Sequence, residues 1–285
     1  MKKISVIIPH YNTPDLLKRC LHSIPDTDNY QVIVVDDNSD PDIVDFSELQ
    51  KTGRSNTSVV LTKEGKGAGY ARNVGLELAD GDWLLFADSD DFFVTEMDSI
   101  LEPYLNSGAD MVIFKANSVD SENLEPSDRD ENINTRIEEA KNKYISAKQA
   151  SIAIQSPWCR LIKREFIEKN NIKFEEVMAC NDTMFTTMAT CLANNIELSS
   201  DALYVVTFRK GSLWDSRKTN PHNYLIRIEV QIRRNKYVKK YGFESLPILG
   251  YVVKAKDLGV MTFLRALWIA ISQRGLLQGI NFYFK

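Results

Sequence analysis

Residues 68–91 read AGYARNVGLELADGDWLLFADSDD, and this stretch decides the fold class. Residues 68–79 fit a helix that Gly81 ends, and residues 83–87 form the continuous apolar run of a strand covered on both faces. The strand stops at the acidic residues 88–91. A helix that leads directly into a buried strand is typical of a βαβ series, so the stretch predicts a parallel sheet.

The same alternation of helix and strand extends in both directions from this stretch. It predicts an α/β protein with a mostly parallel, Rossmann-like sheet and helices on both faces. The other strands are expected at residues 4–8, 32–35, 59–61, 111–114 and 202–208. The other helices are expected from Pro14, at residues 96–106, 146–155 and 163–170, from Asp182, and in a C-terminal extension from about residue 219. Residues 116–145 are polar and are expected to form a long connection or a partly ordered insertion.

The composition fits a soluble globular protein, with 44% hydrophobic and 26% charged residues. The apolar run near the N-terminus is too short for a signal peptide, and no stretch reaches the roughly 18–20 apolar residues of a membrane-spanning helix. Four cysteines without CxxC spacing and three scattered histidines predict buried free thiols and no zinc site. We therefore expect a cytoplasmic protein.

The net charge of −4 hides an uneven distribution along the chain. Residues 201–285 hold 15 Lys and Arg against 5 Asp and Glu, a net charge of +10, whereas residues 1–200 carry −14. A basic end of this kind either packs on the acidic body or meets an anionic partner. A membrane surface, a diphosphate-linked acceptor and nucleic acid are anionic, and of these we expect no nucleic acid.

Two acidic clusters follow predicted strands, at residues 36–40 (DDNSD) and 88–91 (DSDD). Because ligands bind beyond the carboxyl ends of parallel strands, both clusters are expected on one rim of the sheet. Carboxylates there suit Mg²⁺ or Mn²⁺, which completes its shell with phosphate and water. Solvated turns with aspartate as a capping residue would give the same pattern.

Three glycines, Gly65, Gly67 and Gly69, precede Arg72 near the start of a predicted helix. Glycine lets a backbone approach a phosphate, and a helix N-terminus favours an anion. The spacing, however, matches neither G-x-G-x-x-G after the first strand nor the GK[ST] of a P-loop. The glycines alone therefore do not identify a phosphate site.

Three motifs in register resemble those of the inverting family-2 glycosyltransferases with the GT-A fold, of the bacterial surface-polysaccharide type. They are SVIIPHYN (5–12), VVDDNSD (34–40) and GYARNVGLELADGDWLLFADSDD (69–91), and the likeness in order, spacing and strand context covers residues 4–115. The resemblance implies transfer of a sugar from a nucleotide diphosphate, with uracil favoured as the base, to the hydroxyl of a carbohydrate or lipid-linked acceptor. It also implies Mn²⁺ or Mg²⁺ as the cofactor.

The resemblance assigns donor-side roles to six residues. Pro9 and Tyr11 would contact the nucleotide, with Tyr11 against the base, and Asp37 would hydrogen-bond the base. Arg72 would stand near the base or phosphates, Asp88 near the ribose or donor sugar, and Asp90 would bind the metal. His10 departs from the apolar or small residue that is common in the family, and we expect little consequence.

The resemblance places the general base at Asp182, where the family has a Glu-Asp pair that opens a helix. Asn181 stands in place of the glutamate and is expected to supply only a hydrogen bond. A role for either residue as a helix N-cap is the alternative. Looser matches put Trp158 of SPWCRLIKREFI on the acceptor side, and Arg209 and Ser212 of TFRKGSL at the diphosphate. A buried tryptophan and a surface arginine would explain these last matches as well.

The chain is expected to divide into a nucleotide-sugar-binding half at 1–115, an acceptor-side half of the same domain at 116–215 and a basic helical extension at 216–285. The extension pairs basic charge with a short apolar helix, which favours peripheral contact with the inner face of a membrane; packing on the body or homodimerisation is the alternative. A catalytically degenerate nucleotide-sugar-binding protein also stays open. A sugar nucleotidyltransferase is disfavoured because no glycine-rich loop follows the first strand.

Overall fold

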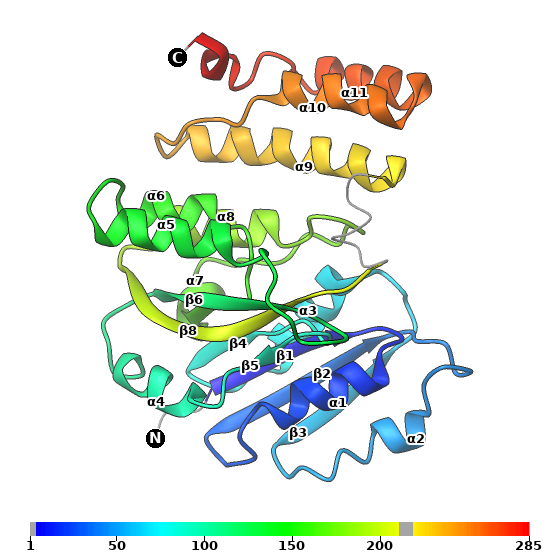
Figure 1. Cartoon of the computed structure of the whole chain (residues 1–285), viewed down its shortest axis with the longest axis vertical. Helices are drawn as coiled ribbons and strands as arrows, with labels where there is room; N and C mark the ends of the chain where they lie inside the picture. The colour runs from blue at the N-terminus through cyan, green and yellow to red at the C-terminus, as the bar shows by residue number, and fades with distance from the viewer. Residues whose placement is uncertain (1–3, 211–218, 285) are drawn as a thin grey trace.

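The computed structural model describes residues 4–210 and 219–284 (Figure 1). Within these residues the strands form one eight-stranded sheet in the order β3-β2-β1-β4-β7-β6-β8-β5. The strands are β1 (Ile4–His10), β2 (Tyr30–Asp37), β3 (Thr57–Thr62), β4 (Trp83–Phe86), β5 (Phe92–Phe93), β6 (Met111–Asp120), β7 (Arg160–Lys163) and β8 (Ile196–Phe208).

The N-terminal half of the sheet is wholly parallel, because β1 pairs in parallel with both β2 and β4, and β2 pairs in parallel with β3. Every residue of β1 and of β4 is buried, which is why these strands read as continuous apolar runs rather than alternating ones. In the other half, β7 is antiparallel to β4 and β6, β6 is parallel to β8, and β5 is antiparallel to β8.

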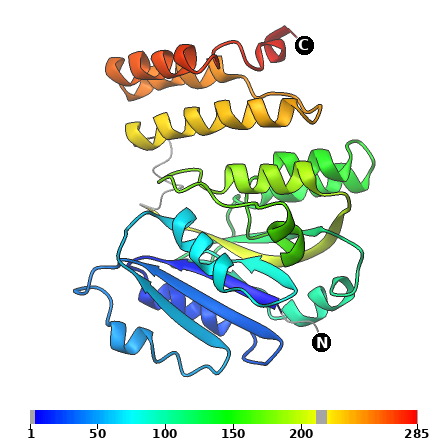
Figure 2. The same ribbon diagram turned by 180° about the vertical axis from the view of Figure 1, so that it is seen from behind.

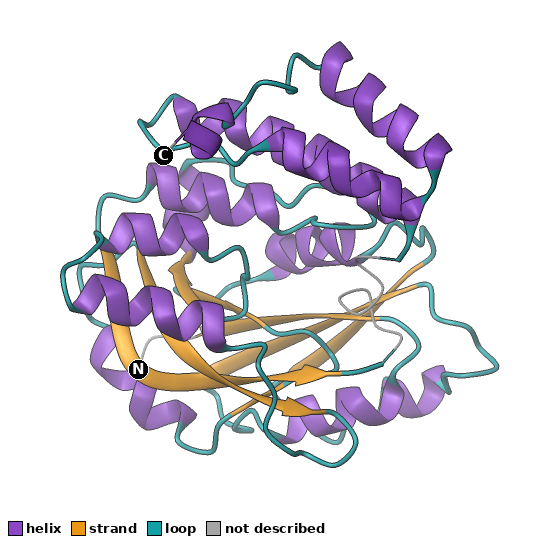
Figure 3. Cartoon of the chain, turned by 45° about the horizontal axis from the view of Figure 1, so that its top comes forward, coloured by secondary structure: helices purple, strands orange, loops and turns teal. Residues whose placement is uncertain are grey.

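Helices cover the sheet on both sides. In Figures 1 and 3, α1 lies on one side, and α5, α6 and α8 lie on the other. The helices are α1 (Pro14–His22), α2 (Phe46–Leu49), α3 (Ala68–Leu78), α4 (Met97–Leu101), α5 (Glu131–Lys141), α6 (Ala147–Ala153), α7 (Arg164–Lys169), α8 (Thr183–Leu192), α9 (Pro221–Lys239), α10 (Ile248–Lys254) and α11 (Val260–Ser272). Short 3₁₀ helices span Glu102–Tyr104, Ala255–Leu258 and Ile280–Phe284. The predicted α/β class, the mostly parallel sheet and the helical C-terminal extension are confirmed.

Of the two forms expected for residues 116–145, the long connection was wrong, because the segment contains regular structure. Strand β6 continues to Asp120, and α5 follows at Glu131–Lys141. Helix α5 buries only Ile133 and Ile137, one turn apart, and its other positions are polar or partly exposed. A stripe of two apolar residues is too narrow to stand out from a charged sequence. The short strands β5 and β7 were also missed.

The C-terminal extension has its own small core. Buried apolar residues of α9, α10 and α11 form a cluster separate from the main core, which spans residues 4–206. In Figures 1 and 2, α9 lies over the layer of α5, α6 and α8, and α10 and α11 form the outermost layer. The predicted divisions at residues 115 and 215 stay predictions.

Side-chain contacts tie α9 to the body. The Arg233 guanidinium donates from Nε and Nη2 to the two carboxylate oxygens of Glu175, at 2.8 and 3.0 Å. Arg234 donates from Nη2 to the Ile152 carbonyl oxygen at 2.8 Å. The extension is therefore fixed against the loop before α8 and against the end of α6.

The remaining predictions about the chain as a whole concern membranes and cysteines. In the part of the chain that the structure describes, no helix is both long and apolar enough to cross a bilayer. All four cysteines are free thiols, and Cys20, Cys159 and Cys191 are buried, whereas Cys180 is only partly buried.

Candidate active site

The predicted donor-side residues meet at one edge of the sheet. The register pairs His10 with Asp36 and Asp37 with Thr62, so β1, β2 and β3 end together. Strand β4 ends at Phe86, two residues before Asp88, next to β1. The two acidic clusters thus lie on the same rim, as the strand pattern predicts.

Residues distant in sequence fix the acidic loop 88–91 through hydrogen bonds. The Asp88 N–H donates to the Tyr204 hydroxyl at 2.8 Å, and the buried Asp91 carboxylate accepts from the Thr207 N–H at 2.6 Å. The Asp90 carbonyl oxygen accepts from Arg19 Nη2 at 2.6 Å and from Thr207 Oγ1 at 2.8 Å. These bonds leave the carboxyl groups of Asp88 and Asp90 partly accessible, with side chains 34% and 24% exposed.

The Asp88 and Asp90 carboxyl groups form an electrostatically unfavourable pair. Burial and the neighbouring Asp88 carboxylate raise the pKa of Asp90, and Arg209, whose Nε lies 3.5 Å from Asp90 Oδ2, lowers it. Burial raises the pKa of Asp91 well above its usual range. A cation placed at Asp88 and Asp90 would relieve their repulsion.

The donor set fits a divalent cation that a diphosphate completes. Mg²⁺ in such sites usually takes one or two carboxylates and fills the rest of its shell with phosphate oxygens and water. Among residues 4–210 and 219–284, no three His, Cys, Asp or Glu side chains gather as a self-sufficient metal site. The carboxylates of Asp88 and Asp90 are the accessible oxygens of this loop, so they can supply the protein's share.

Asp37 orders the turn that leads into α3. Its carboxylate accepts hydrogen bonds from the Gly67 N–H at 2.5 Å and the Lys66 N–H at 3.3 Å. Gly67 has a φ of +90°, which glycine adopts without strain. The base contact predicted for Asp37 stays a prediction, and the structure adds a role in shaping the glycine turn.

His10 is more deeply engaged than the sequence suggested. It is buried, its Nδ1 lies 2.7 Å from Asp36 Oδ2, and its Nε2 accepts from the Thr13 N–H at 3.3 Å. Asp36 also accepts from the N–H and Oγ of Ser39, at 3.0 and 2.6 Å. His10 therefore joins the loops after β1 and β2, so the expectation that it has little consequence was wrong. Pro9 is buried within β1 beside it, and Tyr11 is exposed on the rim.

Arg72 connects a residue of the predicted donor side, Asp88, to one of the predicted acceptor side, Asn181. Its guanidinium is buried and donates from Nη2 to Asp88 Oδ1 at 2.5 Å and from Nη1 to Asn181 Oδ1 at 2.8 Å. It also lies over the Phe174 ring, 5.3 Å from the centroid. Asn181 thus supplies a hydrogen bond, as expected. Its Oδ1 accepts from one terminal nitrogen of the Arg72 guanidinium, and Asp88 accepts from the other.

Asp182 is brought to the site by aromatic packing. Phe185, one turn further along α8, stacks on Phe174 at 3.9 Å between centroids and meets the edge of Phe86, the last residue of β4, at 5.3 Å. Asp182 occupies the N-cap position of α8, but its side chain makes no capping hydrogen bond. The Thr183 backbone N–H, at the first residue of the helix, nonetheless hydrogen-bonds the Asp182 carboxylate, so a role at the helix end stays an alternative.

The surroundings of Asp182 tune its carboxyl group. Burial raises the pKa of Asp182, the Arg72 guanidinium lowers it, and the Asp88 carboxylate raises it. These three side chains are therefore within electrostatic range of one another. A raised pKa brings a carboxylate closer to the range in which it accepts a proton effectively.

Three looser predictions have different outcomes. Trp158 is buried and stacks on Tyr204 at 4.8 Å, so packing explains it and its acceptor contact stays a prediction. Arg209 pairs with Asp90, and its phosphate contact also stays a prediction. Ser212 lies outside the described residues.

Sequence reasoning missed Arg19, Tyr204 and Thr207, which hold the acidic loop in place. Tyr204 lies in the apolar run of β8 and Arg19 in the last turn of α1, so neither carries a local signal. Only the tertiary fold brings these residues into contact with residues 88–91.

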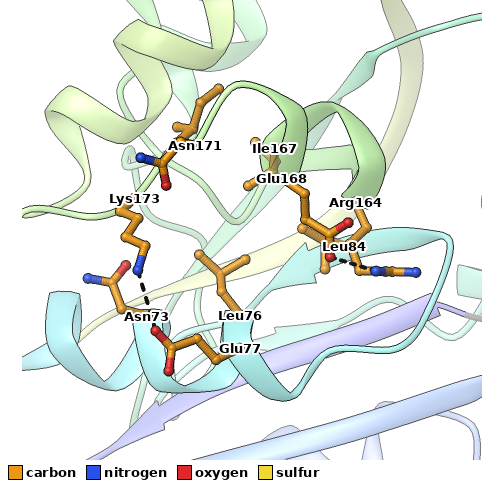
Figure 4. Close-up of a pocket in the computed structure, with 10 residues that line it drawn as sticks. Asn73, Leu76, Glu77, Leu84, Arg164, Ile167, Glu168, Asn171 and Lys173 are labelled. Carbon is orange, nitrogen blue, oxygen red and sulfur yellow. Dashed lines mark hydrogen bonds and ion pairs between the residues drawn. The ribbon is translucent and has the colours of Figure 1, made fainter.

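A pocket of about 310 Å³ lies away from these residues, between α3 and α7 (Figure 4). Its charged side chains already pair with each other, with Lys173 3.4 Å from Glu77 and Arg164 2.6 Å from Glu168. It contains none of the predicted site residues. The chemistry therefore points to the rim rather than to this pocket.

Gly69→Ala tests how closely α3 must approach the loop before α8. An added Cβ would lie 2.2 Å from the Glu175 carbonyl oxygen and 2.9 Å from Asn181 Cβ. Since backbone must move to relieve this contact, we expect a loss of about 1–3 kcal/mol in the free energy of unfolding, measured by urea denaturation. Gly108→Ala is the control, because its Cβ would meet no atom within 4 Å. Equal stability of the two variants would contradict the prediction.

Comparison with known families gives one match, which includes both acidic clusters of the rim. A model described as "Glycosyl transferase family 2" matches residues 5–170, more than half of the chain. The match ends before Asn181 and Asp182.

Two curated relatives are informative. The chain is 31% identical over 228 residues to the glycosyltransferase GlyG of Streptococcus pneumoniae, covering 74% of this chain and 72% of GlyG. It is 27% identical over 242 residues to the poly(ribitol-phosphate) beta-N-acetylglucosaminyltransferase TarS of Staphylococcus aureus, covering 81% of this chain and 41% of TarS. The chain thus spans about two fifths of the length of TarS.

Solved structures share the fold. Residues 1–349 of S. aureus TarS in complex with UDP-GlcNAc align with a TM-score of 0.58 and 22% identity, over 95% of this chain and 73% of that one. The mannosyltransferase PcManGT from Pyrobaculum calidifontis, in complex with GDP-Man and Mn²⁺, aligns with a TM-score of 0.56 and 18% identity, over 95% and 75%. At these identities the likeness shows the fold, and the GT-A architecture expected from the motifs is confirmed.

Proposed function

Because the chain belongs to glycosyl transferase family 2, we propose that it transfers a sugar from a nucleoside diphosphate to an acceptor hydroxyl with inversion at C1. The glycosyltransferase class inferred from the motifs agrees with this membership. One observation carries the finer proposal: the Arg72 guanidinium joins Asp88 to Asn181, beside Asp182. Donor-side and acceptor-side carboxylates therefore belong to a single site.

A uridine diphosphate sugar is the donor that we favour. TarS, which shares the fold over 95% of this chain, has been crystallised with UDP-GlcNAc and with UDP. The names of TarS and of the Bacillus spizizenii poly(ribitol-phosphate) beta-glucosyltransferase describe sugar transfer to a phosphate-linked polymer. These names support an acceptor in polysaccharide or glycolipid synthesis, either carbohydrate or lipid-linked.

In this proposal, one group of residues binds the donor and another residue accepts the proton. Tyr11 is exposed on the rim, where it can lie against the base, and Asp37 stands beside the glycine turn, where it can accept from a base N–H. Asp88, held by Arg72, faces the donor sugar. Asp182 accepts the proton of the acceptor hydroxyl as that oxygen attacks C1 from the face opposite the diphosphate.

Asp90, with Asp88, would hold Mg²⁺ or Mn²⁺. When bound there, the cation supplies positive charge that stabilises the departing diphosphate. Arg209, already paired with Asp90, lies where it can add a second positive charge.

Titration of UDP, GDP and dTDP, each with and without Mn²⁺, tests the proposal by calorimetry. We expect UDP to bind, and to bind more tightly with Mn²⁺, because the diphosphate completes the shell of a cation on Asp88 and Asp90. Binding of GDP instead would keep the transferase and change the donor. Binding of no nucleotide would contradict the proposal, and binding without any transfer or donor hydrolysis would support the degenerate alternative that Asn181 leaves open.

A further inference from the structure

Helix α11 exposes an apolar face. Its solvent-facing arc consists of Val260, Met261, Leu264, Trp268 and Ile271, all of which are exposed. At 100° per residue these five side chains fall within an arc of about 100°, with no polar residue among them. Trp268, the largest, is 70% exposed. We name this set the α11 face.

The opposite side of α11 accounts for its packing. Ala266, Ile269 and Ala270 are buried in the core shared with α9 and α10. The helix is therefore already anchored through one face, and the α11 face contributes nothing to that anchoring. Helices α10 and α11 form the outermost layer (Figures 1 and 2), and the five side chains of the α11 face are exposed to solvent.

The segments that follow α11 expose further apolar side chains. Leu277 is exposed in the turn after α11, and Phe282 and Phe284 are exposed in the last 3₁₀ helix, Phe284 at 82%. A group of exposed apolar side chains on one side of a helix, such as the α11 face, marks an interaction site in a soluble protein.

The charge around the α11 face is positive. Between residues 248 and 284, the exposed cations are Lys254, Lys256, Arg265 and Arg274, and the single acidic residue is Asp257. Arg265 stands on α11 itself at the border of the face. A partner that covers this surface must therefore accept apolar side chains and offer negative charge around them.

We propose that the α11 face inserts into the interface of an anionic phospholipid membrane. An apolar arc with tryptophan, bordered by lysine and arginine, matches the boundary between acyl chains and anionic headgroups. A second copy of the chain fits less well, because a twofold interface would bring the same positive rim against itself. At 13 residues, α11 is about 20 Å long, so it lies along the membrane surface.

The proposal goes beyond the transferase function and does not depend on it. It deepens the expectation that the extension contacts a membrane by naming the face, its border and the lipid charge. A failure of lipid binding with intact nucleotide binding would overturn it and leave the proposed function standing.

Co-flotation of the full chain with vesicles is the first test. We expect binding to vesicles that contain phosphatidylglycerol and much weaker binding to phosphatidylcholine alone. Trp268→Ser should lower the partition coefficient by roughly tenfold or more, because it removes the largest side chain of the face. Arg265→Glu should weaken binding to the anionic vesicles selectively.

Matched controls lie on the loop between α5 and α6. Tyr144 is 80% exposed, so Tyr144→Ser removes an exposed aromatic residue, and Lys143→Glu makes the same charge change as Arg265→Glu. We expect both to bind vesicles as the unchanged chain does. Equal loss in the controls, or no binding to anionic vesicles, would overturn the proposal.

Tryptophan fluorescence and oligomeric state separate lipid from self-association. In a chain that carries Trp214→Phe, because Trp214 lies outside the described residues, anionic vesicles should shift the emission to shorter wavelength. Adding Trp268→Phe should abolish most of that shift, because Trp83 and Trp158 are already buried. A dimer in solution that Trp268→Ser dissociates, without any vesicle binding, would instead assign the α11 face to a second copy.

Discussion

Asp182→Asn is expected to lower turnover by at least ~10²-fold while donor binding is retained. The amide keeps the size of the side chain but cannot accept the proton of the acceptor hydroxyl. Because Asn181, not Asp182, holds Arg72, the contact between Arg72 and Asp88 should survive the substitution. Single-turnover kinetics with the donor identified by titration, together with calorimetric binding of that nucleotide, measures the two quantities separately.

The pH profile gives the same experiment a second readout. Burial raises the pKa of Asp182 above the usual value of about 3.9, so the protonated and inactive form persists to a higher pH than in an ordinary aspartate. Turnover of the unchanged protein should fall as the pH drops through that raised pKa, and the residual turnover of Asp182→Asn should lack this fall.

Asp15→Asn is the control for both measurements, since it removes a carboxylate that is 95% exposed on α1. Near-normal turnover of Asp182→Asn would rule out the role of general base. Loss of nucleotide binding along with turnover would show that Asp182 shapes the site rather than moving a proton.

Asp90→Ala is expected to abolish the part of nucleotide binding that depends on Mn²⁺. The substitution removes one of the two accessible carboxylates of the acidic loop, and the cation then keeps only Asp88. Binding without metal should persist, because Tyr11 and Asp37 lie at the ends of other strands. Titrations of the nucleotide with and without Mn²⁺ give both constants for each variant.

Asp42→Ala is the matched control, because Asp42 is an exposed carboxylate that follows β2 and its loss changes the net charge equally. Unaltered metal dependence in Asp90→Ala would refute the metal role. Comparable losses in both variants would trace the effect to overall charge rather than to a specific ligand.

The parts of the fold that the sequence predicted are those with local signals. Strands β1 and β4 are buried on both faces, so their apolar runs are continuous, and the acidic residues at the ends of β2 and β4 mark the rim. By contrast, α5 offers only Ile133 and Ile137 as an apolar stripe. The short strand β7 pairs with β4 on one side and β6 on the other. Four residues are too few to show a periodicity from which a central strand could be predicted.

The candidate site divides in the same way. Asp88, Asp90 and Asp182 stand in recognisable motifs, and the structure brings them within electrostatic range. The residues that hold them come from distant elements: Arg19 from α1 and Tyr204 from β8. The role of His10 escaped prediction because its partner, Asp36, is 26 residues away and is known only from the register of β1 and β2.

The ion pair between Arg233 and Glu175 links the C-terminal extension to the loop before α8. Glu175 also donates its backbone N–H to the Asn181 carbonyl oxygen at 3.2 Å, one residue before Asp182. A protein with a different C-terminal extension would lose the partner of Glu175 and leave a half-buried charge beside the loop that carries Asn181 and Asp182. Exchange of the extension for one without an arginine at this position is therefore expected to disturb the loop that carries Asn181 and Asp182.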